Sequence, residues 1–221
     1  MDILSYQYKK RKLDTTPTDK APTEITNKIK NHISDDSKFN IETDDHKIYF
    51  KGKVTNDKVE KLIEIIDKKN KTITTMKNNP MVLDVVPKPI HLHITSYGGD
   101  LLAGFRAIDA IKRSKIPIYT IVDGYAASAA TLMSVAGVKR FMTPNSYMLI
   151  HQLSSVTFGK FWEIKDDFEN CNMWMQNIYE IYEKNTKMNM EEIKTTLEHD
   201  IWWSARKCVE KGLVDDVYVN E

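Results

Sequence analysis

The sequence predicts an α/β fold with a largely parallel sheet. From about residue 45 to the end of the chain, apolar runs typical of strands alternate with amphipathic stretches typical of helices. Apolar residues make up 41% of the chain and gather after residue 80, which is enough for one core. Because a helix between two strands lets the second strand run parallel to the first, this alternation favours βαβ crossovers.

The predicted strands are short apolar or alternating runs. They cover residues 47–50, 90–94, 116–122, 147–150 and 213–219. The predicted helices, of which the first two show the clearest amphipathic spacing, cover residues 58–69, 101–113, 129–135, 161–184, 191–197 and 205–211. Residues 70–79 are polar and poorly patterned, so we expect a loop or a frayed helix there. The helix at 161–184 has more apolar residues than one core stripe needs, which indicates a contact between subunits.

The N-terminal part of the chain differs in composition from the rest. Residues 1–44 are rich in Lys, Asp, Thr and Asn, and we expect them to form a disordered or peripheral arm. The folded domain is expected at residues 45–221. The basic run Lys9–Lys12 is interpreted as part of a solvated tail rather than as a targeting signal.

Charge and hydropathy exclude several classes of protein. Lys and Arg number 32 and Asp and Glu 31, so the net charge is +1, and we expect neither nucleic acid nor a membrane as a partner. The chain has no signal-peptide pattern, and no apolar run approaches the roughly 18 residues that span a bilayer. Cys171 and Cys208 lack metal-ligand spacing and are interpreted as free thiols, although one disulfide is compatible with the sequence. We therefore expect a cytoplasmic protein, or one carried in a particle.

The stretch Gly124–Ala130 is the strongest sign of chemistry. It places Ser128 among small residues, after a predicted strand and at the start of a predicted helix. A serine at such a turn can present its hydroxyl to a pocket, beside free backbone N–H groups, as acyl transfer requires. Taken alone, the same pattern equally describes a serine that caps a helix.

A nucleophilic serine needs a base, and His151 is the candidate. It ends the apolar run 147–150, which would place its ring at the edge of the sheet, where sites of α/β proteins form. His91 and His93 lie two apart and share one face of a strand. Because no third metal ligand is evident near them, we interpret them as an ordinary surface pair. The remaining histidines, His32, His46 and His199, lie in polar segments.

The other parts of a candidate site follow from turns and anchors. Asp200 precedes two tryptophans that would hold it in place, so it could orient a histidine, although it could also be a solvated turn carboxylate. The backbone N–H groups of Gly99 and Ala129 could stabilise an oxyanion. The turn at Gly98-Gly99 could instead be a simple helix start with Asp100 as its cap.

Six motifs, in order, resemble those of the Clp protease proteolytic subunit family. They cover roughly residues 46–218, with extra residues around 70–86. The matching stretches are Thr95-Ser96-Tyr97-Gly98-Gly99, Gly124 to Ala129, Lys139 to Asn145, His151-Gln152-Leu153, Asp200 to Ala205 and Lys211 to Asp215.

This resemblance implies a crotonase-like spiral of βαβ units with a projecting handle helix at about 160–186. It implies a serine endopeptidase with Ser128 as nucleophile, His151 as base and Asp200 as orienting acid, and with Gly99 and Ala129 as oxyanion donors. It implies polypeptide substrates and a chamber formed by a double heptameric ring, a tetradecamer. No metal or organic cofactor is implied. ATP would be hydrolysed only by a separate AAA+ unfoldase, because the chain has no phosphate-binding loop motif.

Several positions depart from the family pattern. Tyr97 and Leu153 stand where the family has proline, which predicts an altered substrate groove. His91, His93 and Asp123 stand where the family has aromatic or apolar residues that dock the unfoldase, so we expect docking to be weakened.

Three alternatives to this function remain. The first is a virus- or phage-encoded maturation protease that acts without an ATPase, and it would keep the same chemistry. The second is a CoA-thioester hydratase or isomerase on the same fold, which would not need a serine nucleophile. The third is a non-catalytic ring subunit, which should lack members of the triad. The complete Ser/His/Asp set argues against the second and the third.

Overall fold

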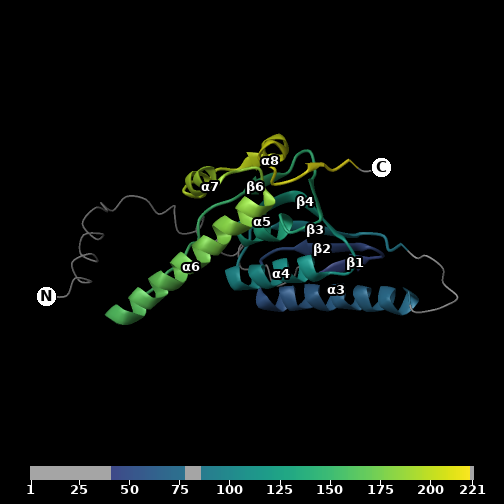
Figure 1. Ribbon diagram of the computed structural model, residues 1–221, viewed down its shortest axis with the longest axis horizontal. Coiled ribbons are helices and arrows are strands. Elements are labelled where there is room, and N and C mark those ends of the chain that lie inside the picture. The colour runs from purple at the N-terminus through teal and green to yellow at the C-terminus, as the bar shows by residue number, and fades with distance from the viewer. Residues whose placement is uncertain (1–40, 78–85, 220–221) are drawn as a thin grey trace, which may run out of the picture. The chain divides into compact units, whose positions relative to one another are not determined.

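The computed structural model describes residues 41–77 and 86–219, all within a compact unit that spans Phe39–Glu221. Its centre is an eight-stranded sheet whose main order is β1-β2-β3-β4-β5-β8 (Figure 1). All neighbours along this path are parallel except β1 and β2, which form an antiparallel pair at the edge. The predicted α/β fold with a largely parallel sheet is therefore confirmed.

Most predicted elements are present. The strands are β1 (Glu42–Asp44), β2 (Lys47–Lys51), β3 (Ile90–Ser96), β4 (Ile118–Ala127), β5 (Lys139–Met142), β6 (Tyr147–Leu149), β7 (Trp203–Ser204) and β8 (Asp216–Val217). The helices are α3 (Asn56–Lys77), α4 (Leu101–Arg113), α5 (Ala129–Ser134), α6 (Phe161–Asn185), α7 (Met190–Leu197) and α8 (Ala205–Lys211).

The strand β4 is longer than predicted because it has a second partner. Its first half pairs with β5, and Tyr125–Ala127 pairs with β6, which also pairs with β7. We expected the strand to end at residue 122, where the apolar run ends. Instead it continues through Gly124 and delivers the chain to Ser128.

Short polar strands were not predicted. Residues 42–44, which we assigned to the arm, form β1, whose three side chains are all exposed and therefore show no alternation. Residues 1–40 of the predicted arm lie outside the described residues. Conversely, the predicted last strand at 213–219 is reduced to Asp216–Val217, because only Phe141 and Met142 of β5 are there to pair with it.

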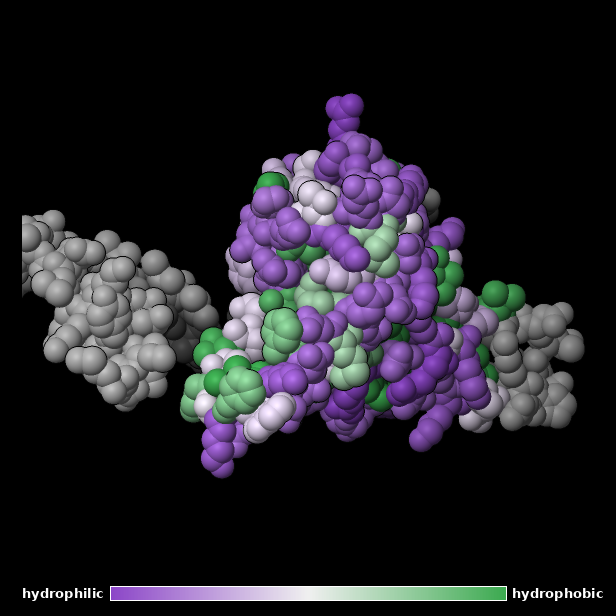
Figure 2. Space-filling view, turned by 60° about the vertical axis from the view of Figure 1, so that its left-hand side comes forward, coloured by the Kyte–Doolittle hydropathy of each residue, from purple (hydrophilic) through white to green (hydrophobic). Residues whose placement is uncertain are grey.

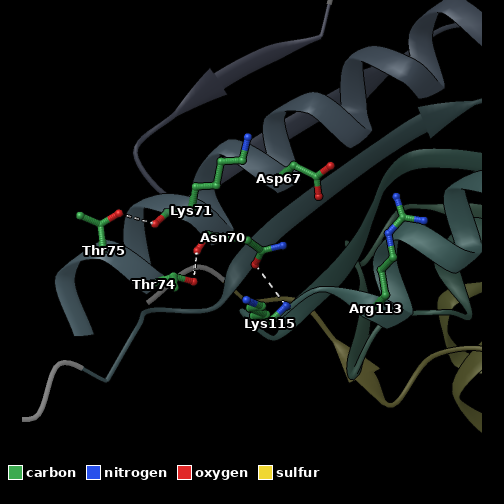
Figure 3. Close-up of a pocket in the computed structure, with 7 residues that line it drawn as sticks. All are labelled: Asp67, Asn70, Lys71, Thr74, Thr75, Arg113 and Lys115. Carbon is green, nitrogen blue, oxygen red and sulfur yellow. Dashed lines mark hydrogen bonds between the residues drawn. The ribbon is translucent and has the colours of Figure 1, made fainter. Parts of the chain in front are cut away.

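The helix α3 continues through the stretch that we interpreted as a loop or frayed end. Three threonine hydroxyls donate to carbonyls one turn earlier, so the helix satisfies its polar side chains internally. Asn70 also accepts hydrogen bonds from the backbone N–H of Lys115 at 3.1 Å (Figure 3) and from that of Ile116 at 3.2 Å. Asn70 therefore connects α3 to the turn before β4. The local sequence pattern does not reveal this long-range contact.

Helices α3 and α4 cover one face of the sheet (Figure 1). Val59, Leu62 and Ile66 of α3 are buried there, at the spacing of an amphipathic helix. Alternate residues of the strands face them, such as Ile48 and Leu92. The core therefore lies between this face and the helices, and it fixes the ends of β3 and β4 beneath the site.

Helix α6 leaves the core and projects from it (Figure 1). Only Ile178 and Tyr182, near its C-terminal end, are buried. The first half carries exposed apolar side chains, at Phe161, Trp162, Ile164, Phe168 and Met173. None of the described helices is both long and apolar enough to cross a membrane.

Two of the motif stretches meet at the end of the sheet where β5 pairs with β8. Arg140 of β5 forms an ion pair with Asp215 and donates to the carbonyl of Gly212 at 2.9 Å. These contacts join β5 to the end of α8. Cys171 and Cys208 are free thiols, as predicted.

Candidate functional site

A pocket of about 250 Å³ lies at the carboxyl ends of three neighbouring strands. Gly99 follows β3, Ser128 follows β4 and His151 follows β6, and all three line this pocket. The other lining residues are Tyr97, Leu101, Ala129, Leu132, Gln152, Leu153, Ser154, Ile178 and Tyr182. Because parallel strands place their carboxyl ends at one edge, residues that are far apart in the sequence meet here.

Ser128 has a strained backbone. Its φ is 56° and its ψ is −130°, and among the described non-glycine residues only Asp45 also has a positive φ. A side chain in this conformation costs on the order of 1–3 kcal/mol, so the surrounding structure must impose it. Ser128 N–H donates to the carbonyl of Leu149 at 2.9 Å, which fixes the turn against β6.

The hydroxyl of Ser128 does not cap helix α5. Ser128 occupies the position before the first helical residue, but its side chain makes no capping hydrogen bond. The capping interpretation is therefore wrong. Ser128 instead lines the pocket, at a turn that resembles the strained strand-to-helix turns on which nucleophilic serines are found.

The carbonyl of Ser128 is anchored to α6 through one threonine. Thr131 Oγ1 donates to this carbonyl at 2.6 Å and lies 2.6 Å from the hydroxyl of Tyr182. Tyr182 is fully buried, and burial raises the pKa of its phenol. The hydroxyl therefore stays protonated and can donate to Thr131.

Gly98 allows the Ser128 turn to lie close to the strand β3. It has a φ of 90°, and a Cβ on it would lie 2.7 Å from Ser128 Cβ and 2.6 Å from the carbonyl oxygen of Ala127. A side chain here would therefore displace the candidate nucleophile. The same Cβ would lie 3.0 Å from Ala129 N, so the absence of a side chain lets the turn after β3 pack closely against the start of α5.

The N–H groups of Gly99 and Ala129 are available to a ligand. Val54 forms a parallel bridge opposite Gly99 and bonds to its two neighbours, Gly98 and Asp100, at 2.8 and 2.9 Å. In such a bridge the N–H of the central residue points away from the partner strand. Ala129 is the first residue of α5, where N–H groups have no partner within the helix.

His151 and Asp200 lie together. His151 Nδ1 is 3.2 Å from Asp200 Oδ1, and the neighbouring Gln152 N–H donates to the carbonyl of Leu197 at 2.8 Å. The ring of His151 is largely covered, whereas the carboxylate of Asp200 is 77% exposed. No hydrogen bond joins the His151 ring to the Ser128 hydroxyl in this structure, although both line the pocket.

The anchor of Asp200 differs from what we expected. We predicted that the two tryptophans after it would be buried, but Trp202 is 39% exposed and Trp203 is half-buried. The position of Asp200 instead depends on β7, in which Trp203 pairs with Met148 of β6. This pairing holds the loop that carries Asp200 beside β6, the strand that precedes His151.

The interpretation of His91 and His93 as a surface pair is wrong. The ring of His93 is stacked on Tyr49 at 4.8 Å, and the residue is only 8% exposed. Neither ring nitrogen of His93 has a hydrogen-bond partner. Burial lowers the pKa of His93 to about 4, against a smaller opposing effect of Asp123, whose carboxylate lies 3.9 Å away.

No metal centre is formed by the residues that the structure describes, because no three His, Cys, Asp or Glu side chains come close enough. A second hollow lies between α3 and the turn after α4 (Figure 3). Its lining holds amide, hydroxyl and charged side chains, namely Asp67, Asn70, Lys71, Thr74, Thr75, Arg113 and Lys115. It contains no pairing of a nucleophile with a histidine, so the Ser128 pocket is the candidate site.

Comparison with known proteins identifies the family. The sequence profile described as Clp protease matches residues 47–221. The chain belongs to the Clp protease family. It is 36% identical, over 135 residues, to a protein of Treponema denticola named ATP-dependent Clp protease proteolytic subunit 2, and the match covers 60% of this chain and 68% of that protein.

Membership of the Clp protease family confirms the predicted crotonase-like fold and assigns the chain to the proteolytic subunits of this family. The class of activity is therefore that of a peptidase. Sequence reasoning missed two features of this Clp protease site. Thr131 lies three residues after Ser128, and that spacing could have indicated a bond to its carbonyl. The stacking of Tyr97 on Tyr125 had no local signal, because it joins the turn after β3 to β4.

Proposed function

We propose that this chain is a serine endopeptidase in which Ser128, His151 and Asp200 act as a catalytic triad. The observation that carries the proposal is the strained Ser128, whose hydroxyl is left uncapped in the same pocket as His151. A hydroxyl held in this way, beside free backbone N–H groups, suits attack on a carbonyl.

The reaction proceeds through an acyl-enzyme. His151 accepts the proton of the Ser128 hydroxyl while its oxygen bonds to the carbonyl carbon of the peptide. The oxyanion that forms accepts hydrogen bonds from the N–H groups of Gly99 and Ala129. His151 then gives the proton to the leaving amine as the C–N bond breaks. A water molecule, deprotonated by His151, cleaves the ester and restores the serine.

Asp200 orients the histidine. A carboxylate at 3.2 Å from His151 Nδ1 favours the tautomer with a proton on that nitrogen, which leaves the other nitrogen to accept the serine proton. The exposure of Asp200 calls for a further covering element, and assembly of subunits would supply it.

The proposed assembly is a double heptameric ring that encloses the active sites. The exposed apolar half of α6 supports it, because such side chains gather at the free end of that helix, at the lower left of Figure 2. Isolated subunits would leave this surface in water. ATP hydrolysis, if the chain works with an unfoldase, belongs to that separate partner.

Labelling with a serine-reactive fluorophosphonate tests the triad. The reagent should modify Ser128 alone among the serines, which peptide mapping of the adduct would show. His151→Ala should abolish the labelling, because an unassisted serine hydroxyl reacts poorly. Labelling at another serine, or labelling of Ser128 that His151→Ala leaves unchanged, would refute the triad.

A further inference from the structure

Three aromatic rings form an exposed surface beside the Ser128 pocket. Tyr97 lines the pocket, and 67% of its surface is exposed. Its ring is stacked on Tyr125, with centroids 4.2 Å apart and planes 28° apart. Trp202 meets Tyr97 edge-on at 6.2 Å, with planes 85° apart. We call Tyr97, Tyr125 and Trp202 the aromatic shelf.

The shelf is built from segments next to the candidate oxyanion donor Gly99 and the triad residues Ser128 and Asp200. Tyr97 directly precedes Gly98 and Gly99, Tyr125 lies in β4 three residues before Ser128, and Trp202 lies two residues after Asp200. Any peptide with its scissile carbonyl at Ser128 therefore passes the shelf within a few residues. Among the exposed large apolar residues that the structure describes, only Tyr97 lines the pocket.

The geometry leaves room for one more ring. Stacking on Tyr125 covers one face of Tyr97, and Trp202 meets it at an angle, so the large exposed fraction of Tyr97 includes its opposite face. Aromatic pairs favour offset-stacked and edge-to-face arrangements, and a further ring could adopt either here. Exposed aromatic surface of this extent costs free energy in water, which a bound side chain would recover.

The pocket lining points to an uncharged, apolar substrate segment. No Lys, Arg, Asp or Glu lines the pocket, and its walls beyond the polar residues are leucine, isoleucine and tyrosine side chains. Charge therefore gives no basis for selecting a substrate side chain at this place. Shape and aromatic contact are the remaining bases for selection.

We propose that Tyr97 is a specificity-determining residue, and that its ring binds an aromatic side chain of the peptide close to the scissile bond. This inference rests on the peptidase function proposed above, because it takes the Ser128 pocket as the place of cleavage. The occupant is a substrate segment, since the shelf is continuous with the pocket that holds the candidate nucleophile.

A purely structural role of Tyr97 makes a different prediction. Because Tyr97 touches Trp202, it could simply hold the Asp200 loop in place. Loss of the ring would then slow the cleavage of every peptide by the same factor. A side-chain contact would instead change the ratio between aromatic and non-aromatic peptides.

The test uses quenched fluorescent peptides of one sequence, in which each position within three residues of the cleaved bond carries Trp or Ala in turn. For the wild type, kcat/KM should favour Trp at one position by about five- to tenfold. Tyr97→Ser should remove this preference, whereas Tyr97→Phe should keep it. Tyr147→Ser is the matched control, because Tyr147 is an exposed tyrosine of β6 that does not line the pocket, and it should keep the preference.

Two results of the cleavage test would overturn the proposal. A wild type without any position that favours Trp would refute it, and so would Tyr97→Ser that slows both peptides equally. Binding of dye-labelled Trp and Ala peptides to Ser128→Ala, followed by fluorescence anisotropy, separates the two proposals. A Tyr97-dependent preference for Trp in binding, with no hydrolysis by the wild type, would support the shelf and refute the peptidase function.

Discussion

The strands β3 and β4 each contribute to two regions with different chemistry. Beyond their carboxyl ends lie Gly98, Gly99 and Ser128, where backbone strain and free N–H groups form the pocket. On their flat face lie the rings of His91, His93, Tyr49, Tyr119, Phe141 and Tyr218, which we call the histidine face.

The two regions leave polar groups without partners for different reasons. In the pocket, the Ser128 hydroxyl lines open space that a substrate can fill. On the histidine face, both ring nitrogens of His93 are covered by neighbouring aromatic rings, so burial keeps the imidazole neutral. An unsatisfied polar group therefore indicates chemistry only where a ligand can reach it.

The most severe test of this contrast replaces one serine of the pocket. Ser128→Ala should lower kcat for peptide hydrolysis by at least about 10⁴-fold, because it removes the nucleophile. Ser134→Ala is the matched control, since Ser134 lies at the other end of α5 and its buried hydroxyl has no partner. It should keep activity and leave stability equal or slightly higher. Activity of Ser128→Ala within tenfold of the wild type would break the contrast.

A double variant tests whether the pocket works as one unit. Ser128→Ala and His151→Ala should each be nearly inactive, and the two together should be about as inactive as either alone. Steady-state rates of the three variants, measured at high enzyme concentration, provide the comparison. Rate losses that multiply would show that His151 does not serve Ser128.

Much of the pocket could be predicted because its residues follow recognisable strands. His151 comes directly after an apolar run, Ser128 lies between a predicted strand and a predicted helix, and strand ends meet at one edge. The histidine face could be predicted less well. The alternation of β3 places His91 and His93 on one face but does not show that Tyr49 and Tyr218, from distant segments, cover that face. Likewise, the pattern at Asn70 gave no sign that α3 would continue, because its partner lies 45 residues later.

A third prediction concerns α6, which borders the pocket but is absent from the histidine face. The wild type should sediment as an oligomer far heavier than the 25.6 kDa chain. Each large apolar side chain that becomes buried contributes roughly 1.5–3 kcal/mol, so Trp162→Asp with Phe168→Asp should shift the protein toward smaller species. Since both residues are exposed, the double variant should keep its circular dichroism spectrum. A stable wild-type monomer at micromolar concentration would contradict the ring.

We expect the histidine face to weaken the docking of a partner ATPase. A bacterial unfoldase supplied with ATP and a folded, tagged substrate should stimulate degradation by the wild type only weakly. Docking would remove water from the exposed Asp123 carboxylate and the half-buried His91 imidazole. Such groups cost about 1–3 kcal/mol each when desolvated without partners, and an apolar anchor gains correspondingly less. The variant with His91→Tyr, His93→Tyr and Asp123→Leu should be stimulated several-fold more. Strong stimulation of the wild type that the variant leaves unchanged would exclude these residues as the cause.

The smallest expected effect is on stability at mildly acidic pH. Because burial lowers the pKa of His93 from 6.5 to about 4, the unfolded chain binds a proton in this range that the folded chain does not. The contribution of neutral His93 to the unfolding free energy is therefore fully present above pH 6.5, and it is lost as the pH falls toward 4. Between these limits, the unfolding free energy of the wild type should fall by on the order of 1 kcal/mol more than that of His93→Phe.

Chemical denaturation at pH 7.5 and pH 4.5 measures this difference. His199→Phe provides the control, because His199 is exposed, and its pH dependence should equal that of the wild type. Equal pH dependence of the wild type and His93→Phe would show that the imidazole is hydrated in solution.

Hydrogen bonds from the Ser128 carbonyl through Thr131 to the Tyr182 hydroxyl connect the turn before α5 with helix α6. Helix α6 is mostly exposed, so its free end can bend or fray at little cost, whereas its buried end shares this hydrogen-bonded chain with the turn of the candidate nucleophile. The buried end of α6 is therefore coupled by hydrogen bonds to the turn that carries Ser128. Docking of a second subunit against the free end of α6 would therefore change the geometry of Ser128.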